Sequence, residues 1–373
     1  MKKCDKREWP DSPAAKSALL ISAICLLSGV SADNQVYKQA PMWAHHVPGK
    51  VSTLNALNDT TLIGGENGLY KVDYAKITAW FVETSGSVTA VKPLDDGRII
   101  GASSDGSMKL VDAAGNVIWD RTVPGYVGYG NALDADDGGI ICGSMDGYVY
   151  MLDLNGTYRW KHLVGSYVTY TRLLADRAIA VSDRQAYILD RDGKVRLNLN
   201  IVGYIRYAEV TEEEIIIGMS DGTLEVYDID GSRMWGYKTG QNITAVDGDS
   251  NITVGTRERH VYHLSKDGTL LWELNMSDAV AAVRGDEGRI LIGTQDGKSS
   301  LYTDQGGLKW FYETDGRPTA LDMRGQHVIS GTTTGWTYYS KLPTKDPATS
   351  FIVSVAVMAI VGASLLMVSR SWR

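Results

Sequence analysis

Cysteine is scarce in this sequence. The 373 residues include three cysteines, Cys4, Cys25 and Cys142, and no two of them are adjacent. Cys4 and Cys25 belong to the N-terminal region, so removal of that region would leave Cys142 alone. A lone cysteine excludes an internal disulfide, a metal site of paired cysteines and a haem-attachment motif. The apolar run at residues 139–143 predicts that Cys142 is a buried structural thiol rather than a reactive one.

Positive charge and catalytic constellations are also lacking. The formal net charge is -7, whereas a general nucleic-acid binder normally carries a basic stripe, so we expect no nucleic-acid partner. The six histidines are scattered, and neither a trustworthy Ser-His-Asp spacing nor a phosphate-binding loop is present. His45 and His46 are predicted to lie on the surface. We therefore expect no catalytic residue.

A tryptophan recurs at a nearly constant interval. The column consists of Trp43, Trp80, Trp119, Trp160, Trp235, Trp272 and Trp310, and Leu197 fills the single gap. Successive members are 37 to 41 residues apart. A fixed period of this length indicates one supersecondary unit repeated along the chain.

Each repeat has the pattern of four short strands. In residues 126–160 the alternation predicts strands at 127–133, 139–143, 148–152 and 157–162, and Asp146-Gly147 and Asn155-Gly156 predict tight turns. Aspartate recurs at these turns, and no unit contains a full Asp-x-Asp-x-Asp-Gly loop, so we expect turn chemistry and no metal. First strands are predicted to begin at Val51, Val88, Val127, Val168, Ile205, Ile243, Val280 and Pro318.

These units predict an all-β fold, an eight-bladed β-propeller of four-stranded antiparallel blades. The segment around Trp43 precedes the first inner strand, and the last repeat stops near Leu342 without an outer strand. We therefore expect the N-terminal segment to complete the last blade, which closes the ring and leaves no exposed edge.

The repeats resemble those of the pyrroloquinoline-quinone (PQQ) type, most clearly at residues 143–160, 218–235 and 255–272. The resemblance implies that the tryptophans pack between blades. Some members are quinone-dependent dehydrogenases that use adjacent cysteines, calcium and an acidic base, and others are non-catalytic scaffolds, including an outer-membrane assembly factor. Without adjacent cysteines or assignable ligands, we expect a non-catalytic binding or scaffolding propeller without a cofactor. The alternatives are a PQQ-dependent oxidoreductase and a structural envelope component without a specific ligand.

The two ends of the chain predict membrane targeting. Residues 1–32 have a basic start, a short apolar stretch and a small-residue site, which indicates a signal peptide or an uncleaved anchor. Residues 351–368 carry no charge, which favours a transmembrane helix over a buried core helix. Residues 33–342 form the propeller, 343–350 a linker and 369–373 a basic cytoplasmic tail. We expect a single-pass plasma-membrane protein with an extracytoplasmic propeller.

Five Asn-x-Ser/Thr sequons agree with an extracytoplasmic propeller. Such sites accept N-glycans when they are exposed in a secreted domain. The candidate acceptors are Asn58, Asn155, Asn242, Asn251 and Asn275.

Tyrosines gather in the first strands of the third, fourth and fifth blades. The first column contains Tyr126, Tyr167 and Tyr204, and the second contains Tyr129, Tyr170 and Tyr207. Arg172 and Arg206 are interleaved with them. One interpretation is that the tyrosines plug the channel or pack between blades. The other is a binding patch for a glycan, a peptide or a partner protein, for which tyrosine offers apolar area and a polar tip. We expect this rim to face away from the membrane.

Overall fold

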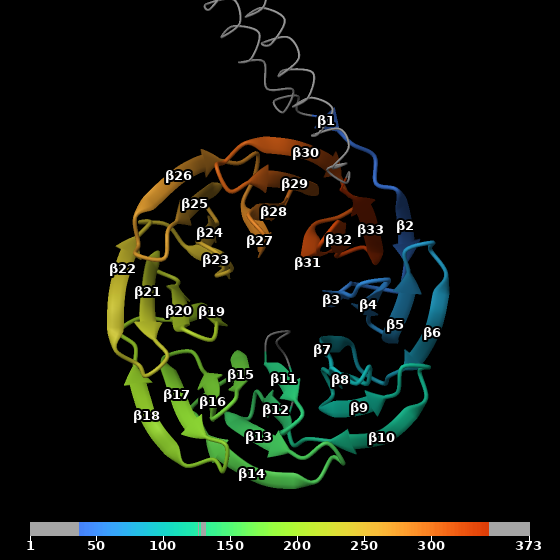
Figure 1. The fold of residues 1–373 in the computed structure, drawn as a ribbon, viewed down its shortest axis with the longest axis vertical. Helices are drawn as coiled ribbons and strands as arrows, with labels where there is room; N and C mark the ends of the chain where they lie inside the picture. Colours follow the sequence, from blue (N-terminus) through green and yellow to red (C-terminus); the bar gives the residue numbers. More distant parts are fainter. Residues whose placement is uncertain (1–36, 126, 128–131, 343–373) are drawn as a thin grey trace, which may run out of the picture.

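The molecule is a ring of antiparallel β-sheets around a central channel (Figure 1). The computed structural model describes residues 37–342 except residues 126 and 128–131. The predicted eight-bladed, all-β fold is confirmed, with eight separate sheets. The predicted signal or anchor, linker, transmembrane helix and tail all lie outside the described residues. Within those residues, no helix has the length and apolar character needed to cross a membrane.

Blades 1 to 4 follow one another along the chain, each with its inner strand first. Blade 1 contains β3 (Thr53–Ala56), β4 (Thr60–Gly64), β5 (Gly68–Asp73) and β6 (Thr78–Glu83). Blade 2 contains β7 (Val88–Pro93), β8 (Ile99–Ser103), β9 (Ser107–Val111) and β10 (Val117–Thr122). Blade 3 contains β11 (Leu133–Asp136), β12 (Gly139–Gly143), β13 (Tyr148–Leu152) and β14 (Tyr158–Leu163). Blade 4 contains β15 (Tyr170–Leu174), β16 (Arg177–Val181), β17 (Gln185–Asp190) and β18 (Val195–Asn200).

Blades 5 to 8 continue the ring. Blade 5 contains β19 (Ile205–Val210), β20 (Glu214–Met219), β21 (Thr223–Asp228) and β22 (Arg233–Lys238). Blade 6 contains β23 (Ile243–Asp247), β24 (Ile252–Thr256), β25 (His260–Leu264) and β26 (Leu270–Asn275). Blade 7 contains β27 (Val280–Asp286), β28 (Arg289–Thr294), β29 (Lys298–Thr303) and β30 (Leu308–Glu313). Blade 8 contains β31 (Pro318–Arg324), β32 (His327–Thr332) and β33 (Trp336–Lys341).

The N-terminal segment closes the ring as predicted. The strand β2 (Trp43–His46) pairs antiparallel with β33 and forms the outer strand of blade 8, with Trp43 opposite Tyr339. A two-residue strand, β1 (Tyr37–Lys38), adds to blade 7 parallel to β30. The first and last parts of the described chain therefore share one blade, and no ladder edge is left open at the seam.

The inner strand of blade 3 begins later than the prediction of residues 127–133. It is β11, in which Asp134 pairs with Ile141 and Asp136 with Gly139, so the ladder continues into residues expected to form the turn. The Asp136 carboxylate accepts a hydrogen bond from the Gly138 N–H at 2.8 Å and closes a tighter turn. Val127 is buried ahead of this strand, and its carbonyl accepts a hydrogen bond from the Thr89 hydroxyl of blade 2. The strands β3 and β15 likewise begin two residues after the predicted starts.

The tryptophan column joins neighbouring blades, as the resemblance implied. Each indole N–H from Trp43 to Trp272 donates to a carbonyl in a turn of the next blade, at 2.8 to 3.1 Å. Most of these turns hold a glycine against the indole. A Cβ at Gly193 would approach the Trp160 ring to 2.6 Å, and Gly193 has a positive φ of 85°. Glycine is therefore required at position 193 for two reasons: the turn needs a positive φ, and the indole leaves no room for a Cβ.

Two members of the column differ from the rest. Leu197 packs against Gly231 of blade 5, but its side chain has no N–H group to donate to the turn. The Trp310 indole N–H is buried and has no hydrogen-bond partner among the described residues. The blade after Trp310 is blade 8, whose outer strand β2 comes from the other end of the chain. In this blade β33 is therefore not followed by the turn whose carbonyl accepts the indole N–H in the other blades.

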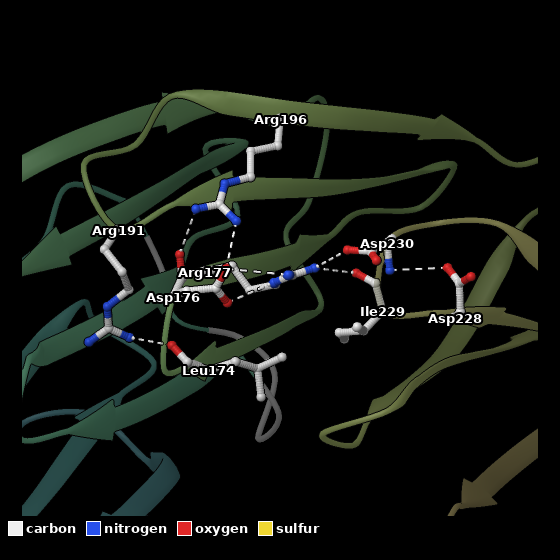
Figure 2. A network of polar contacts seen from close by, with 8 residues as sticks. All are labelled: Leu174, Asp176, Arg177, Arg191, Arg196, Asp228, Ile229 and Asp230. Carbon is white, nitrogen blue, oxygen red and sulfur yellow. Dashed lines mark hydrogen bonds and ion pairs between the residues drawn. The ribbon is translucent and has the colours of Figure 1, made fainter.

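An arginine network links blades 3, 4 and 5 on the face where the inner strands end, and Figure 2 shows the part of it in blades 4 and 5. Arg177 donates to Asp176 and crosses to the Ile229 carbonyl and to Asp230 of blade 5, both at 2.8 Å. Arg196 binds Asp176 at 2.7 Å. On the other side, Arg191 donates to the Leu174 carbonyl and to Asp136 of blade 3. These contacts brace three consecutive blades.

Candidate functional site: the central channel

The channel holds a cavity of about 750 Å³ between the inner strands. Its wall is mostly polar and has two levels. At the start of the inner strands lies the channel mouth, defined by Lys50, Arg206, Asn242, Gln295 and Arg317. Gln295 belongs to this level because its N–H donates to the carbonyl of Ala279, the residue before β27. Near the other end of the strands lies a ring of eight polar side chains, seven of them charged, which we call the charged ring.

The charged ring takes one residue from each of the eight inner strands. Each member occupies the same register, opposite the second strand of its own blade. All members line the cavity: Asn55, Lys92, Asp134, Arg172, Glu209, Asp247, Arg284 and Asp322. Inner strands converge on the axis, so equivalent positions from separate repeats become neighbours around the channel.

Ion pairs in the ring run between blades. Arg284 of blade 7 lies between Asp322 of blade 8 at 3.0 Å and Asp247 of blade 6 at 3.3 Å. Asp134 of blade 3 contacts Lys92 of blade 2 at 2.7 Å and Arg172 of blade 4 at 3.7 Å. Asp134, Asp247 and Asp322 are buried. Paired charges of this kind hold the blades in position.

The three aspartates of the ring also bind the next blade through its backbone. Asp134 accepts from the Leu173 N–H at 2.9 Å, and Asp247 accepts from the Gly285 N–H at 2.8 Å. Asp322 accepts from the Ala56 N–H at 2.6 Å and so joins blade 8 to blade 1. In each case the donor follows the ring residue of the next blade by one position. Hydrogen bonds to a charged acceptor are stronger than neutral ones, which suits a ring closure.

Glu209 is the charged member without an ion pair or a carboxylate hydrogen bond among the described residues. Burial, reinforced by the Asp247 carboxylate, raises its pKa to about 7, while the charges of Arg284, Arg172 and Lys266 oppose this shift. Burial also raises the pKa values of Asp247 and Asp322, with Arg284 opposing the shift in both. Near neutral pH, Glu209 is therefore divided between its neutral and ionised forms.

The two tyrosine columns have different environments. In the first column, Tyr167 and Tyr204 are 44% and 39% exposed on the rim. In the second, Tyr170 is buried between blades 4 and 5, and its hydroxyl accepts a hydrogen bond from the Val210 N–H at 3.0 Å. Tyr207 is half-buried and packs against the core between blades 5 and 6. Tyr126 and Tyr129 lie outside the described residues.

The two candidate arginines lie at different levels. Arg206 is exposed at the mouth, with its guanidinium 5.9 Å from the centre of the Tyr204 ring. Arg172 belongs to the charged ring, where it contacts Asp134 at 3.7 Å and Glu212 at 3.9 Å. The structure thus brings Arg206, Tyr204 and Tyr167 to one rim and assigns Arg172 and Tyr170 to contacts between blades.

The candidate glycosylation sites lie on several surfaces. Asn58, Asn155 and Asn275 are exposed. Asn242 is half-buried at the mouth, and the Asn251 amide donates to the Asp304 carboxylate at 3.1 Å.

The charged ring was missed from the sequence although a signal for it exists. In seven blades the ring residue stands five positions after the residue equivalent to the first-column tyrosines. Asn55, for example, follows Lys50, and Arg172 follows Tyr167. The late start of β11 shifts Asp134 out of this alignment. A comparison of charged residues across the repeats would have revealed the ring.

Comparison with known proteins gives one family and several structural relatives. Residues 220–334 match the family model described as "Outer membrane protein assembly factor BamB". No curated protein gives a significant sequence match.

Solved structures agree with the fold along most of the chain. BamB from Moraxella catarrhalis is 16% identical, with a TM-score of 0.68, and the match covers 81% of this chain and 99% of BamB. The computationally designed Ika8 protein is 18% identical, with a TM-score of 0.73 and coverage of 82% and 99%. Sqt1 from Saccharomyces cerevisiae is 11% identical, with a TM-score of 0.72 and coverage of 83% and 100%. At these identities the likeness shows the fold.

The fold and the channel define the class: an eight-bladed β-propeller with a polar central channel. Within that class, the family-model match over residues 220–334 and the repeat pattern show a similarity to PQQ-like β-propellers.

The channel does not fit the quinone chemistry found in part of this family. The sequence has no adjacent cysteines. The aspartates at the channel wall are bound to arginine, to lysine or to backbone N–H groups. In the described part of the chain, no three His, Cys, Asp or Glu residues form a group that could hold a metal ion.

Proposed function

We propose that this chain is a non-catalytic binding or scaffolding propeller that holds a partner protein on the rim of blades 4 and 5, outside the plasma membrane. The supporting observation is a surface of exposed apolar and aromatic side chains, here called the tyrosine surface and defined by Tyr167, Val202 and Tyr204. Val202 is 96% exposed beside two tyrosines that are each more than one-third exposed. Aromatic side chains of this kind are enriched at the centres of protein interfaces.

The loop that carries Val202 and Tyr204 is short and anchored at both ends. The Ile201 N–H donates to the Arg184 carbonyl at 2.9 Å, and the Ile205 N–H donates to the Asp183 carbonyl at 2.7 Å. Gly203 between them has a φ of 154°. An anchored loop loses little conformational entropy when a partner binds, which favours affinity.

The direction of the chain supports a membrane tether on the opposite face. The Leu342 N–H donates to the Gln326 carbonyl, in the turn between β31 and β32. That turn lies at the face where the inner strands end, away from the tyrosine surface. A tether formed by residues 351–368 would leave the tyrosine surface directed outward.

The binding function is tested by affinity capture from native membranes. The Tyr167→Ala/Tyr204→Ala variant should lose the partner that the wild-type protein captures, because both aromatic contacts are removed. A control variant, Tyr158→Ala, removes an exposed tyrosine from the outer strand of blade 3 and should keep the partner. Equal capture by all three proteins would exclude the tyrosine surface as the binding site.

The tether is tested separately by fractionation. The full chain should sediment with membranes, and a chain that ends at residue 342 should not. Association of the shortened chain with membranes at the level of the full chain would exclude residues 343–373 as the tether.

A further inference from the structure

The channel mouth carries three cations without an anionic partner. Lys50, Arg206 and Arg317 are exposed and line the cavity, and none of them forms an ion pair with the residues that the structure describes. This contrasts with the arginines of the charged ring, each of which contacts a carboxylate. The contrast is also notable because the chain as a whole has a net charge of -7.

Among the described residues, no carboxylate lines the cavity at the level of the mouth. Every acidic residue that lines the cavity is a member of the ring: Asp134, Glu209, Asp247 and Asp322. The ring residue follows Lys50 and Arg317 by five positions, roughly 16 Å along the strand, and follows Arg206 by three positions, roughly 10 Å. Other carboxylates on the same face as the mouth do not line the cavity: Asp105 and Asp221 accept hydrogen bonds from their own turns, and Glu66 lies beside Gly49.

The cations converge from opposite sides of the channel. Lys50 and Arg317 belong to the neighbouring blades 1 and 8, whereas Arg206 is on blade 5, across the ring from blade 1 (Figure 1). Burial raises the pKa of Tyr207, and the charges of both Arg206 and Arg317 oppose this shift. All three cations line the same cavity, so they face one channel.

The backbone beneath the cations is fixed. The Arg317 N–H donates to the Thr333 hydroxyl at 3.1 Å, and its carbonyl accepts from the Thr333 N–H at 2.9 Å. Val51, next to Lys50, is held by the Thr332 carbonyl and by the Thr319 hydroxyl. Cations on a fixed backbone can attract an anion without a rearrangement of the blades.

We propose that the channel mouth binds an acidic segment of the partner protein, whose carboxylates contact Lys50, Arg206 and Arg317. This inference rests on the proposed function and adds the chemistry of the bound segment. Arg206 connects the two surfaces, because its guanidinium lies over the Tyr204 ring. A partner that covers the tyrosine surface therefore extends over the mouth, and the polar side chains of Asn242 and Gln295 complete the contact there. Guanidinium groups match carboxylates with paired hydrogen bonds.

The test uses a fluorescein-labelled oligoglutamate peptide and the full-length protein, with binding measured by fluorescence anisotropy. The peptide should bind, and the matched oligoglutamine and oligolysine peptides should not. The Lys50→Gln/Arg206→Gln/Arg317→Gln variant should weaken binding by about tenfold or more. Added salt should weaken it as well, because the three cations are exposed to solvent.

A matched control separates this site from the overall charge. The Lys194→Gln/Lys238→Gln/Arg257→Gln variant removes the same charge from exposed positions outside the cavity and should bind the peptide like the wild type. Equal binding by the two triple variants, or no binding of oligoglutamate by the wild type, would overturn the inference. Competition by succinate or inorganic phosphate at the concentration of the peptide would assign the mouth to small anions instead.

This result is distinguishable from a failure of the proposed function. If Tyr167→Ala/Tyr204→Ala abolishes partner capture but oligoglutamate does not bind, the partner-binding surface stands and the acidic segment is excluded. If oligoglutamate binds the mouth but capture does not depend on the tyrosines, the mouth is an anion site and the proposed partner surface is excluded.

Discussion

The two ends of the channel use charge in different ways. At the charged ring, Arg284 contacts two aspartates, and three aspartates bind backbone N–H groups of the next blade. At the mouth, the described residues offer no carboxylate to Lys50, Arg206 or Arg317. Both levels come from the same inner strands of the same repeats. The difference indicates that the paired charges hold the blades together, whereas the unpaired cations of the mouth are available to bind an acidic partner.

The largest expected effect is at the ring closure. Asp322→Ala leaves the buried Ala56 N–H without its acceptor and removes one of the two aspartate partners of Arg284, which keeps Asp247. We expect a loss of about 2–4 kcal/mol in the free energy of unfolding, measured by chemical denaturation. Arg317→Gln at the mouth, which removes a charge without an ion-pair partner, should change it by no more than about 0.5 kcal/mol. Similar losses in the two variants would contradict the distinction between the two levels.

A smaller effect is expected for the buried tyrosine of the second column. Tyr170→Phe keeps the ring in the core but removes the hydroxyl that accepts the Val210 N–H. A buried N–H without a partner costs about 1–3 kcal/mol, so thermal unfolding should begin at a lower temperature. Tyr204→Phe, at an exposed position, should leave the unfolding midpoint unchanged. A midpoint for Tyr170→Phe equal to that of the wild type would mean that water replaces this contact.

The scaffold could be predicted because its signals repeat in every unit. The tryptophan column and the turn glycines contact each other between blades, so their spacing predicts both the blade count and the packing. The swap of β2 into blade 8 was also predictable, because the last repeat lacks an outer strand while Trp43 precedes the first.

The contacts of the charged ring and the burial of the individual tyrosines were harder to predict. Which aspartate an arginine contacts depends on side-chain directions between separate blades, and the sequence pattern does not contain these. The tyrosines of the two columns are the same residue type and three positions apart, but the first column precedes the inner strand and the second lies in it, and they differ in burial. Tyr167 reaches solvent, whereas Tyr170 enters the space between blades 4 and 5.

Glu209 gives the ring a dependence on pH. Its pKa of about 7 lies above the ordinary value of 4.5, so the folded state binds this proton more tightly than the unfolded state. Its contribution to stability is therefore present at low pH and is lost as the pH rises through about 7.

Glu209→Gln should remove this dependence. The free energy of unfolding of the variant, relative to the wild type, should increase by about 1–3 kcal/mol between about pH 5 and pH 8. The titration of Asp322 is common to both proteins, whereas that of Asp247 changes with the substitution because its carboxylate interacts with Glu209. Denaturation at several pH values measures this difference, with Glu213→Gln, an exposed neighbour, as the control. A constant difference across this range would show that Glu209 is ionised throughout, with a partner outside the described residues.

The smallest effect on stability is expected at the tyrosine surface. In Tyr167→Ala/Tyr204→Ala, two side chains that are 44% and 39% exposed are removed, and neither hydroxyl makes a hydrogen bond within the described part of the chain. Each change should alter the free energy of unfolding by no more than about 0.5 kcal/mol, as is usual for surface positions. Capture of the partner should nevertheless be lost, since a few aromatic side chains supply most of the affinity at protein interfaces. A loss of stability as large as that of Tyr170→Phe would show that Tyr167 and Tyr204 support the blades, and the tyrosine surface would then belong with the charged ring as part of the scaffold.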